Sequence, residues 1–374
     1  MANNRTPVYC TRNKIYYTQD FNETFGSTCQ AIIFVQDSAG NFTIPLNPDA
    51  PLISTNYGQS EYTFSIDQVL GASNIFEKVP APEPENTVRF LDNFLVPYKV
   101  QTKILGSSVA AAMSSTFLAI NAKIKADHYF HFKDGSTAGQ NFMEDYIGGK
   151  QGFLNNAPTI KTTSLKATEL LSFAFNINPC PPVIQIVAYI VDINNQKSKL
   201  IVDKLTVSEN DVLEMNVSYT KIRQLSQVDL KRYIIYLQDE SGNKISDDKM
   251  YYIDTVENED EEQILFKNLF GVWDSIRLLS NRSESKEVER LSFENEYNES
   301  IDYYQRGTTK FTFRTGPLER GYLKYIGEEL LFSPEIYYQG LRINCTTNSL
   351  EVFNPVAHTE GAALEFTLAT SQQF

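Results

Sequence analysis

The residue types that most often perform catalysis or hold metals are sparse in this chain and poorly placed for either task. Its 374 residues include only three histidines, and His128 and His131 lie three positions apart. On a helix that spacing could share a metal, but the surrounding residues are typical of a strand, where positions i and i+3 face opposite sides. His358 falls in an expected loop. The histidines therefore predict no metal site.

The acidic residues also lack a pattern that points to chemistry. Asp247-Asp248 and the run 257–262 could bind calcium, but they lack the alternating ligands and the turn glycine of a calcium loop. A pair of carboxylates for glycoside hydrolysis could be brought together by any fold, and nothing in the sequence supports one. The chain has no Gly-x-Ser-x-Gly elbow, phosphate loop or zincin helix. We therefore expect no enzyme, no cofactor and no metal.

Cysteine and tryptophan are equally uninformative about chemistry. The four cysteines are far apart in the sequence, without the close pairs of a metal site: Cys10, Cys29, Cys180 and Cys345. We expect small buried apolar residues, with a structural disulfide as the minor alternative, and the sequence leaves their state open. Trp273, the only tryptophan, could form a platform for a sugar. Its apolar surroundings favour a core position instead.

The composition favours strands over helices. Phe and Tyr number 24 and 21, and such aromatics, together with frequent Thr, Val and Ile, are typical of β-structure. The net charge of −13, from 33 basic and 46 acidic residues, argues against a nucleic-acid partner, which requires clustered Lys and Arg. We find no apolar signal sequence and no run of about 20 apolar residues, so we expect a soluble chain made in the cytoplasm, without membrane insertion.

Short alternating runs separated by turn signals predict two β-sandwich-like domains with few short helices. Residues 1–158 form the first, with a Pro-rich connector near 79–86, and residues 159–374 form a β-rich second domain. Within the second, 233–237 and 250–253 predict a hairpin around the turn at 239–243. One clearer helix is expected at 317–332, where apolar residues recur every three or four positions before Pro334.

Several segments resemble, in the same order, a class of tail-associated virion proteins in phages and prophages of Bacteroidetes bacteria. They are 62–70 (YTFSIDQVL), 152–158 (GFLNNAP), 245–254 (ISDDKMYYID), 266–275 (FKNLFGVWDS) followed by 288–290 (VER), and 321–337 (GYLKYIGEELLFSPEIY). The most recognisable is 266–275, where the class pattern has a second Gly and a Thr in place of Val272 and Ser275. The resemblance spans most of the chain.

The resemblance implies a structural or host-contacting part of the tail tip or baseplate, located in the virion, and it supplies no catalytic residues. The positions that carry this signature are Phe266, Asn268, Gly271, Trp273, Asp274, Tyr322, Leu330 and Ser333. The expected partners are other tail proteins and further copies of the chain in a homo-oligomeric ring, with a host surface glycan as a further candidate. Strand edges, or the loops at 134–158 and 254–263, are the expected contacts.

Two alternatives follow from the same sequence. A carbohydrate-binding or adhesin module would recognise a bacterial surface glycan and lose binding when an exposed aromatic residue is replaced. A glycan-degrading enzyme would lose turnover when a single carboxylate is replaced.

Overall fold

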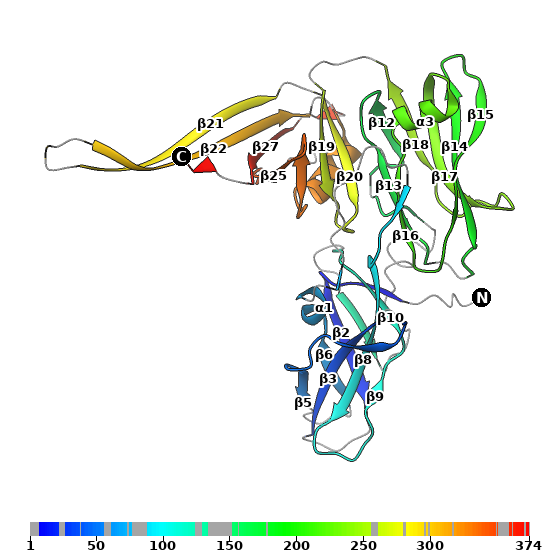
Figure 1. Cartoon of the computed structure of the whole chain (residues 1–374), viewed down its shortest axis with the longest axis vertical. Coiled ribbons are helices and arrows are strands. Elements are labelled where there is room, and N and C mark those ends of the chain that lie inside the picture. The colour runs from blue at the N-terminus through cyan, green and yellow to red at the C-terminus, as the bar shows by residue number, and fades with distance from the viewer. Residues whose placement is uncertain are drawn as a thin grey trace.

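The computed structural model describes residues 7–21, 27–37, 39–55, 61–72, 75–76, 88–123, 129–133, 152–155, 157–176, 179–255, 261–279, 282–294, 297, 300–315, 318–348, 350, 359–360, 362–369 and 372–373. These residues form a mainly β protein with few, short helices (Figure 1). The predicted fold class is thus confirmed. The described strands fall into three modules, which Figure 1 shows as separate lobes.

The N-terminal module contains two sheets that enclose one core. The larger sheet has the order β1-β10-β8-β3-β4, with β5 beside β3 and β9 beside β8, and the smaller has the order β11-β2-β6. Burial alternates along β3, as expected of a strand that covers a core with one face. The elements are β1 (Val8–Cys10), β2 (Lys14–Asp20), β3 (Thr28–Gln36), β4 (Phe42–Pro45), β5 (Leu52–Thr55), β6 (Glu61–Ser65), α1 (Asp67–Ala72), β8 (Leu95–Ile104), β9 (Ala112–Met113), β10 (Phe117–Ile120) and β11 (Tyr129–Lys133).

The middle module has a five-stranded sheet of order β12-β18-β17-β14-β15 and a three-stranded sheet of order β13-β16-β7. The predicted hairpin is confirmed, because β17 and β18 pair in antiparallel fashion. The elements are β7 (Val88–Phe90), β12 (Ile160–Ser164), β13 (Leu170–Ala174), β14 (Val183–Asp192), β15 (Lys197–Thr206), β16 (Val212–Asn216), α3 (Tyr219–Ser226), β17 (Leu230–Asp239) and β18 (Lys249–Asp254).

The C-terminal module is built on one sheet of order β20-β19-β24-β25-β27-β22-β21, with β28 beside β22, and on the pair β23-β26. The hairpin of β21 and β22 extends far from the body of this module (Figure 1). The elements are β19 (Glu261–Lys267), β20 (Trp273–Leu279), β21 (Ser283–Glu294), β22 (Ser300–Arg314), β23 (Leu318–Glu319), α4 (Arg320–Tyr325), the π-helix η1 (Ile326–Leu330), β24 (Ile336–Tyr338), β25 (Leu341–Cys345), β26 (Thr359–Glu360), β27 (Ala363–Leu368) and β28 (Gln372–Gln373).

The predicted helix at 317–332 is present as α4 followed by η1. It begins at Arg320, because Leu318 and Glu319 pair with β26 as a short strand instead. Its last turn is a π-turn, in which the Leu331 N–H donates to the carbonyl of Ile326. Among the helices of the described segments, none combines the length and the apolar content that crossing a membrane requires.

The division of the chain at residue 158 stays a prediction, and the sheets add two facts to it. Strand β7 precedes that boundary but pairs with β16 beyond it, with Phe90 opposite Leu213. Two of the hydrophobic cores lie mainly in the second part, one in each of its modules. The Pro-rich connector near 79–86 lies outside the described residues.

Four hairpins close with the same five-residue turn. It begins at Asp37, Asp192, Asp239 and Asn268, and in each the first N–H donates to the fifth carbonyl over 2.8–3.0 Å. The side-chain oxygen of the first residue accepts the N–H of the fifth in every case. The fourth residue has a positive φ, which glycine adopts without strain, and three of the four turns have glycine there. Residues 31–41 (AIIFVQDSAGN) and 233–243 (YIIYLQDESGN) thus repeat one strand and turn in two modules.

Candidate functional site

The turn between β19 and β20, residues 268–272, lies where the three modules meet. Its Leu269 carbonyl accepts the N–H of Lys123 from the N-terminal module over 2.8 Å. The Leu269 N–H donates to the carboxylate of Glu329 in the C-terminal module over 2.7 Å. Phe270, Val272 and Trp273 all belong to the core of the N-terminal module. One hairpin of the C-terminal module therefore supplies part of the core of its neighbour.

Asn268 forms this turn and ties it to the chain that leads into the middle module. Its Oδ1 accepts the N–H groups of Phe270 and Val272 at 3.0 and 3.3 Å. Its Nδ2 donates to the Leu154 carbonyl over 2.9 Å, and the residue is fully buried. An Asp could form the turn, as at Asp37 and Asp239, but a carboxylate has no N–H for Leu154. The hydrogen bond from Nδ2 to the Leu154 carbonyl therefore explains why position 268 has an amide side chain and not a carboxylate.

Gly271 is required here for two reasons. Its φ is 83°, in the left-handed region that side chains rarely adopt. A Cβ at this position would lie 3.0 Å from the Asn121 carbonyl oxygen of the N-terminal module. The glycine therefore allows close approach of two backbones at a contact between modules.

Trp273 is a core residue, as its apolar surroundings predicted. It is 1% exposed, and its ring makes an edge contact with Tyr337 at 5.6 Å between centroids. The ammonium group of Lys267 lies 5.1 Å from the indole centroid, and it also pairs with Glu335 at 2.8 Å. A buried indole cannot act as an exposed platform for a sugar.

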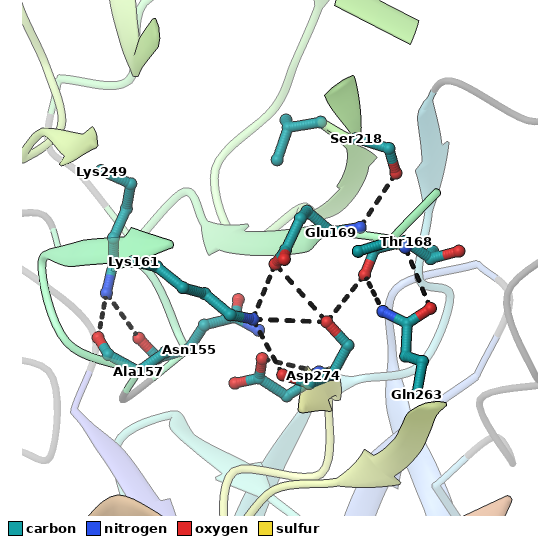
Figure 2. A network of polar contacts seen from close by, with 12 residues as sticks. Asn155, Ala157, Lys161, Thr168, Glu169, Ser218, Lys249, Gln263 and Asp274 are labelled. Carbon is teal, nitrogen blue, oxygen red and sulfur yellow. Dashed lines mark hydrogen bonds and ion pairs between the residues drawn. The ribbon is translucent and has the colours of Figure 1, made fainter. Parts of the chain in front are cut away.

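A buried ion pair joins β12 and the start of β13 to β20 (Figure 2). Lys161 Nζ lies 2.7 Å from Glu169 Oε2 and also donates to the Ser275 carbonyl over 2.8 Å. The side chains of Lys161 and Glu169 are only 4% and 2% exposed. Ser275 Oγ in turn donates to the carbonyl of Thr168 over 2.7 Å. The pair therefore holds the middle module against β20 of the C-terminal module.

The electrostatics of this pair follow from its burial. Burial alone would lower the pKa of Lys161, but Glu169, Tyr322 and Asp274 outweigh it, so the pKa is raised and the ammonium form is stabilised. Burial raises the pKa of Glu169, against the opposing effect of Lys161. Burial, together with the nearby carboxylates, raises the pKa of Tyr322 to about 12, in spite of the ammonium of Lys161.

Further polar contacts surround the ion pair (Figure 2). Lys249 Nζ donates to the carbonyls of Asn155 and Ala157 over 3.0 and 2.7 Å. Asn155 Nδ2 donates to the Trp273 carbonyl over 3.1 Å, and its Oδ1 accepts the N–H of Ser172 over 2.7 Å. These bonds attach the chain that enters the middle module to β13 and β18 of that module and to β20 of the C-terminal module.

The same junction is reinforced at its outer edge. Gln263 of β19 forms two hydrogen bonds with the Thr168 backbone, at 3.0 Å to its N–H and 2.7 Å to its carbonyl. Arg277 of β20 pairs with Asp254 of β18 at 2.9 Å and with Glu261 at 3.0 Å. These contacts add to the buried ion pair in joining the middle module to the C-terminal module.

A small cavity of about 10 Å³ lies beside this network and is lined by Lys161, Glu169, Lys249, Asp274 and Tyr251, among others. That volume is close to the space that a single water molecule requires. It is far below the several hundred Å³ typical of a small-molecule site. The network therefore serves to position modules and offers no room for a substrate.

The structure places seven of the eight signature residues in two groups. Asn268, Gly271, Trp273 and Asp274 lie together at the junction, and Tyr322 is close enough to influence the ion pair there. Phe266 and Leu330 lie in the C-terminal core instead.

Ser333, the last of the eight, ends the helical segment. Its N–H donates to the Leu330 carbonyl over 3.1 Å, and its hydroxyl donates to the Glu335 carbonyl over 2.9 Å. The residue therefore has a local structural role.

The other candidates for chemistry have ordinary surroundings. The four cysteines are free; Cys10 and Cys29 are buried, as expected of small apolar residues, whereas Cys180 and Cys345 are half-buried. No group of three metal-ligating side chains occurs among the described residues. His131 lies in strand β11, whereas His128 and His358 lie outside the described residues.

Sequence reasoning missed the partners of the junction. Lys161, Glu169, Asn155 and Lys249 are spread over nearly a hundred positions, and no local spacing marks them. One signal was available: Lys161 and Glu169 are charged residues within strongly apolar or β-branched stretches, where buried charges are usually paired.

Comparisons with known proteins assign the chain to no family. No family model matches it, and no curated protein matches it. SGBP-B of the Bacteroides ovatus mixed-linkage glucan utilization locus, in complex with a mixed-linkage heptasaccharide, aligns at 10% identity over 76% of this chain and 61% of that chain, with a TM-score of 0.16.

Two further solved structures align equally weakly. Dimeric latent PorU from Porphyromonas gingivalis aligns at 9% identity over 78% of this chain and 28% of that one, with a TM-score of 0.18. Cadherin domains 1–4 of protocadherin gamma B7 give 9% identity, 84% and 74% coverage, and a TM-score of 0.13. Scores this low carry no information about function.

Proposed function

We propose that this protein is a non-enzymatic structural component of a phage or phage-like virion, in the tail tip or baseplate region. There it assembles with itself and with other tail proteins. The proposal agrees with the resemblance of residues 266–275 to tail-associated proteins, and those residues occupy the junction of the three modules.

The observation that carries the proposal is the β21–β22 hairpin. It projects from the body of the C-terminal module and bears large apolar side chains that are exposed, namely Val288, Leu291, Phe293 and Tyr297. Exposed large apolar side chains along a projecting ribbon are consistent with a surface that another molecule covers. A projecting arm on a body of firmly joined modules suits a part that is built into a larger particle.

Analysis of purified particles tests this function directly. Particles from an induced culture would be examined by quantitative proteomics and by antibody gold labelling under the electron microscope. We expect the protein in stoichiometric amount, with label at the tail end. A protein that is absent from particles and found only in cell extract or on cells would contradict the proposal.

The second candidate is a carbohydrate-binding or adhesin module. The exposed aromatic side chains of Phe293 and Tyr297 favour it, since sugars stack on exposed rings. It predicts saturable binding of bacterial surface glycans, measured by calorimetry, that Tyr297→Ala weakens and Trp273→Phe leaves unchanged.

A further inference from the structure

The five-stranded sheet of the middle module has two faces of different character. One face packs on the core of that module, where Ile186, Tyr233 and Tyr251 are buried. Side chains alternate between the faces along a strand, and directly paired residues of neighbouring strands lie on the same face. We call the opposite face the outer face. It contains the even-numbered residues of β12 and β18, those of β17 from Arg232 on, the odd-numbered residues of β14, and Lys197, Lys199, Ile201 and Lys204 of β15.

The outer face carries large apolar side chains from one edge of the sheet to the other. Ile160 on β12, Tyr252 on β18 and Ile201 on β15 are 58%, 36% and 51% exposed. Ile234 and Tyr236, on the strand between them, are half-buried. Aromatic residues, together with Met and Arg, are enriched at the centres of protein interfaces. The outer face therefore has the apolar composition of a contact surface.

The outer face is also basic, although the whole chain has a net charge of −13. Its residues include four cations and one carboxylate. The carboxylate, Asp254, pairs with Arg277 of β20, and one of the cations, Lys204, pairs with Glu240 of the adjoining turn. Among the described residues, no carboxylate pairs with the other three cations, which are Lys197, Lys199 and Arg232.

Two of these three cations are held in place by neighbouring side chains of the outer face. Lys199 Nζ donates to Gln238 Oε1 over 2.7 Å and lies 5.9 Å from the centroid of the Tyr236 ring. Arg232 Nη1 donates to the Tyr252 hydroxyl over 3.1 Å. Cations that are already positioned lose less conformational freedom when they meet the carboxylates of a partner.

The outer face is large enough for a stable contact. Its strands have five to ten residues, and at about 3.3 Å per residue and about 4.8 Å between strands they cover roughly 600 Å². A typical protein interface buries about 800 Å² of each partner. Strands β14 and β15 lie on the side of the middle module away from the C-terminal module (Figure 1). The face could therefore supply most of one such interface.

Charge and side-chain shape select the partner. Two outer faces in contact would bring like charges together, which disfavours a symmetric pair of copies. Sugars stack on exposed rings, whereas the most exposed apolar side chains here are the isoleucines Ile160 and Ile201, which pack on the apolar side chains of a protein.

We propose that the outer face docks on a different protein of the particle. The contact surface of that protein is apolar and places carboxylates against Lys197, Lys199 and Arg232. This inference deepens the proposed function, because it names a surface for assembly with other tail proteins, and it rests on that function.

Cross-linking in purified particles tests the contact. A carbodiimide joins an amine to a carboxylate without a spacer, and mass spectrometry identifies both residues. We expect Lys197 or Lys199 to be joined to an Asp or Glu of a different protein. Links from these lysines only to another copy of this chain would overturn the inference. So would their absence while other lysines of the chain are linked to neighbouring proteins.

Charge reversal provides the second measurement. Lys199→Glu should lower the amount of the protein in particles about tenfold at equal expression, because it places a carboxylate against the carboxylates of the partner. Replacement of the cross-linked partner carboxylate by Lys should restore it. Lys324→Glu is the matched control, since Lys324 is 63% exposed and lies on α4, outside the outer face. Circular dichroism checks that each variant is folded.

The outcomes separate the inference from the proposed function. Wild type and Lys199→Glu present in particles in equal amounts would overturn the contact alone and leave a virion protein that assembles through other surfaces. Absence of the wild type from particles would overturn the proposed function and, with it, the inference. Binding of the isolated chain to polygalacturonate, an acidic polysaccharide, that Lys199→Glu abolishes while the variant still enters particles fully, would make the outer face a glycan site and overturn the contact.

Discussion

At the scale of single residues, the junction depends on atoms that only one residue type can supply. Gly271 and Asn268 occupy the same turn geometry as Gly242 and Asp239, which lie in a solvent-exposed hairpin. The exposed turn therefore provides a built-in control for the buried one. If a substitution at 268–272 lowers the free energy of unfolding more than the matching substitution in the exposed turn does, the difference reports on contacts between modules.

Gly271→Ala should destabilise the protein more than Gly242→Ala. The two glycines have φ values of 83° and 85°, so both variants incur the left-handed penalty of about 1–2 kcal/mol. Only at Gly271 would the new methyl meet a backbone oxygen, that of Asn121 at 3.0 Å, whereas no atom lies within 4 Å at Gly242. We expect a further loss of about 1–3 kcal/mol in unfolding by urea. Equal losses in the two variants would show that the modules are not in close contact there.

Asn268→Asp should also destabilise the junction. The turn itself would persist, but the Leu154 carbonyl would lose its buried donor and a carboxylate would be buried at a fully enclosed position. We expect a loss of about 2–3 kcal/mol, measured by urea unfolding near neutral pH. The reverse change in the exposed turn, Asp239→Asn, should have a much smaller effect. A tolerated Asn268→Asp would contradict the role given to Nδ2.

At the scale of elements, β7 is attached to the middle module by a buried pair across neighbouring strands. Arg89 of β7 lies opposite Glu214 of β16, with Nη2 2.6 Å from Oε1. Burial raises the pKa of Glu214 to about 7, although Arg89 opposes the shift. A short strand of three residues thus depends on a carboxylate that titrates near neutrality.

The pH dependence of stability follows from that shift. Between about pH 4.5 and 7 the folded chain holds a proton on Glu214 that the unfolded chain has released, so stability falls as the pH rises through this window. Across this window the free energy of unfolding falls by about 3 kcal/mol because of Glu214. Glu214→Gln should remove it, which would be seen as a smaller difference in unfolding free energy between about pH 5 and about pH 8. Glu240→Gln, at an exposed site, is the control, and identical pH profiles in wild type and Glu214→Gln would refute the assignment.

At the scale of the whole molecule, the Lys161–Glu169 pair couples the middle module to the C-terminal module. Breaking a buried pair by removing one partner leaves a buried charge without compensation. Lys161→Met should therefore cost about 3–5 kcal/mol and separate the unfolding of the two modules into distinct calorimetric transitions. Lys204→Met is the control, since its pair with Glu240 is about half exposed and should contribute at most about 1 kcal/mol.

Addition of Glu169→Leu to Lys161→Met should restore part of the lost stability, because the uncompensated carboxylate is then gone. A double variant as unstable as Lys161→Met would show that the loss comes from the hydrogen bonds to Ser275 instead.

The sequence by itself determined the β-rich fold class, the hairpin at 233–253, the helix near residue 320 and the core position of Trp273. These features depend on local order: alternation along strands, Asp and Gly in turns, a three-to-four residue period and the apolar neighbours of one side chain. The repeated turn at residues 37–41 and 239–243 is equally local, and the sequence alone shows that it recurs.

Only the tertiary structure decided how the modules join and where the β21–β22 hairpin projects. The junction brings residues 121, 155, 161, 249 and 271 together, and contacts over such separations follow from the packing of sheets on one another. A buried charge is tolerated only where a partner from another strand reaches it, so its partner cannot be read from its neighbours in sequence. The exposure of β21 likewise depends on the tertiary structure. Alternation along a strand fixes its two faces, but it does not say whether another element covers either face. Strand β27 pairs with β22 only at residues 310–314, so it does not reach the outer part of the hairpin.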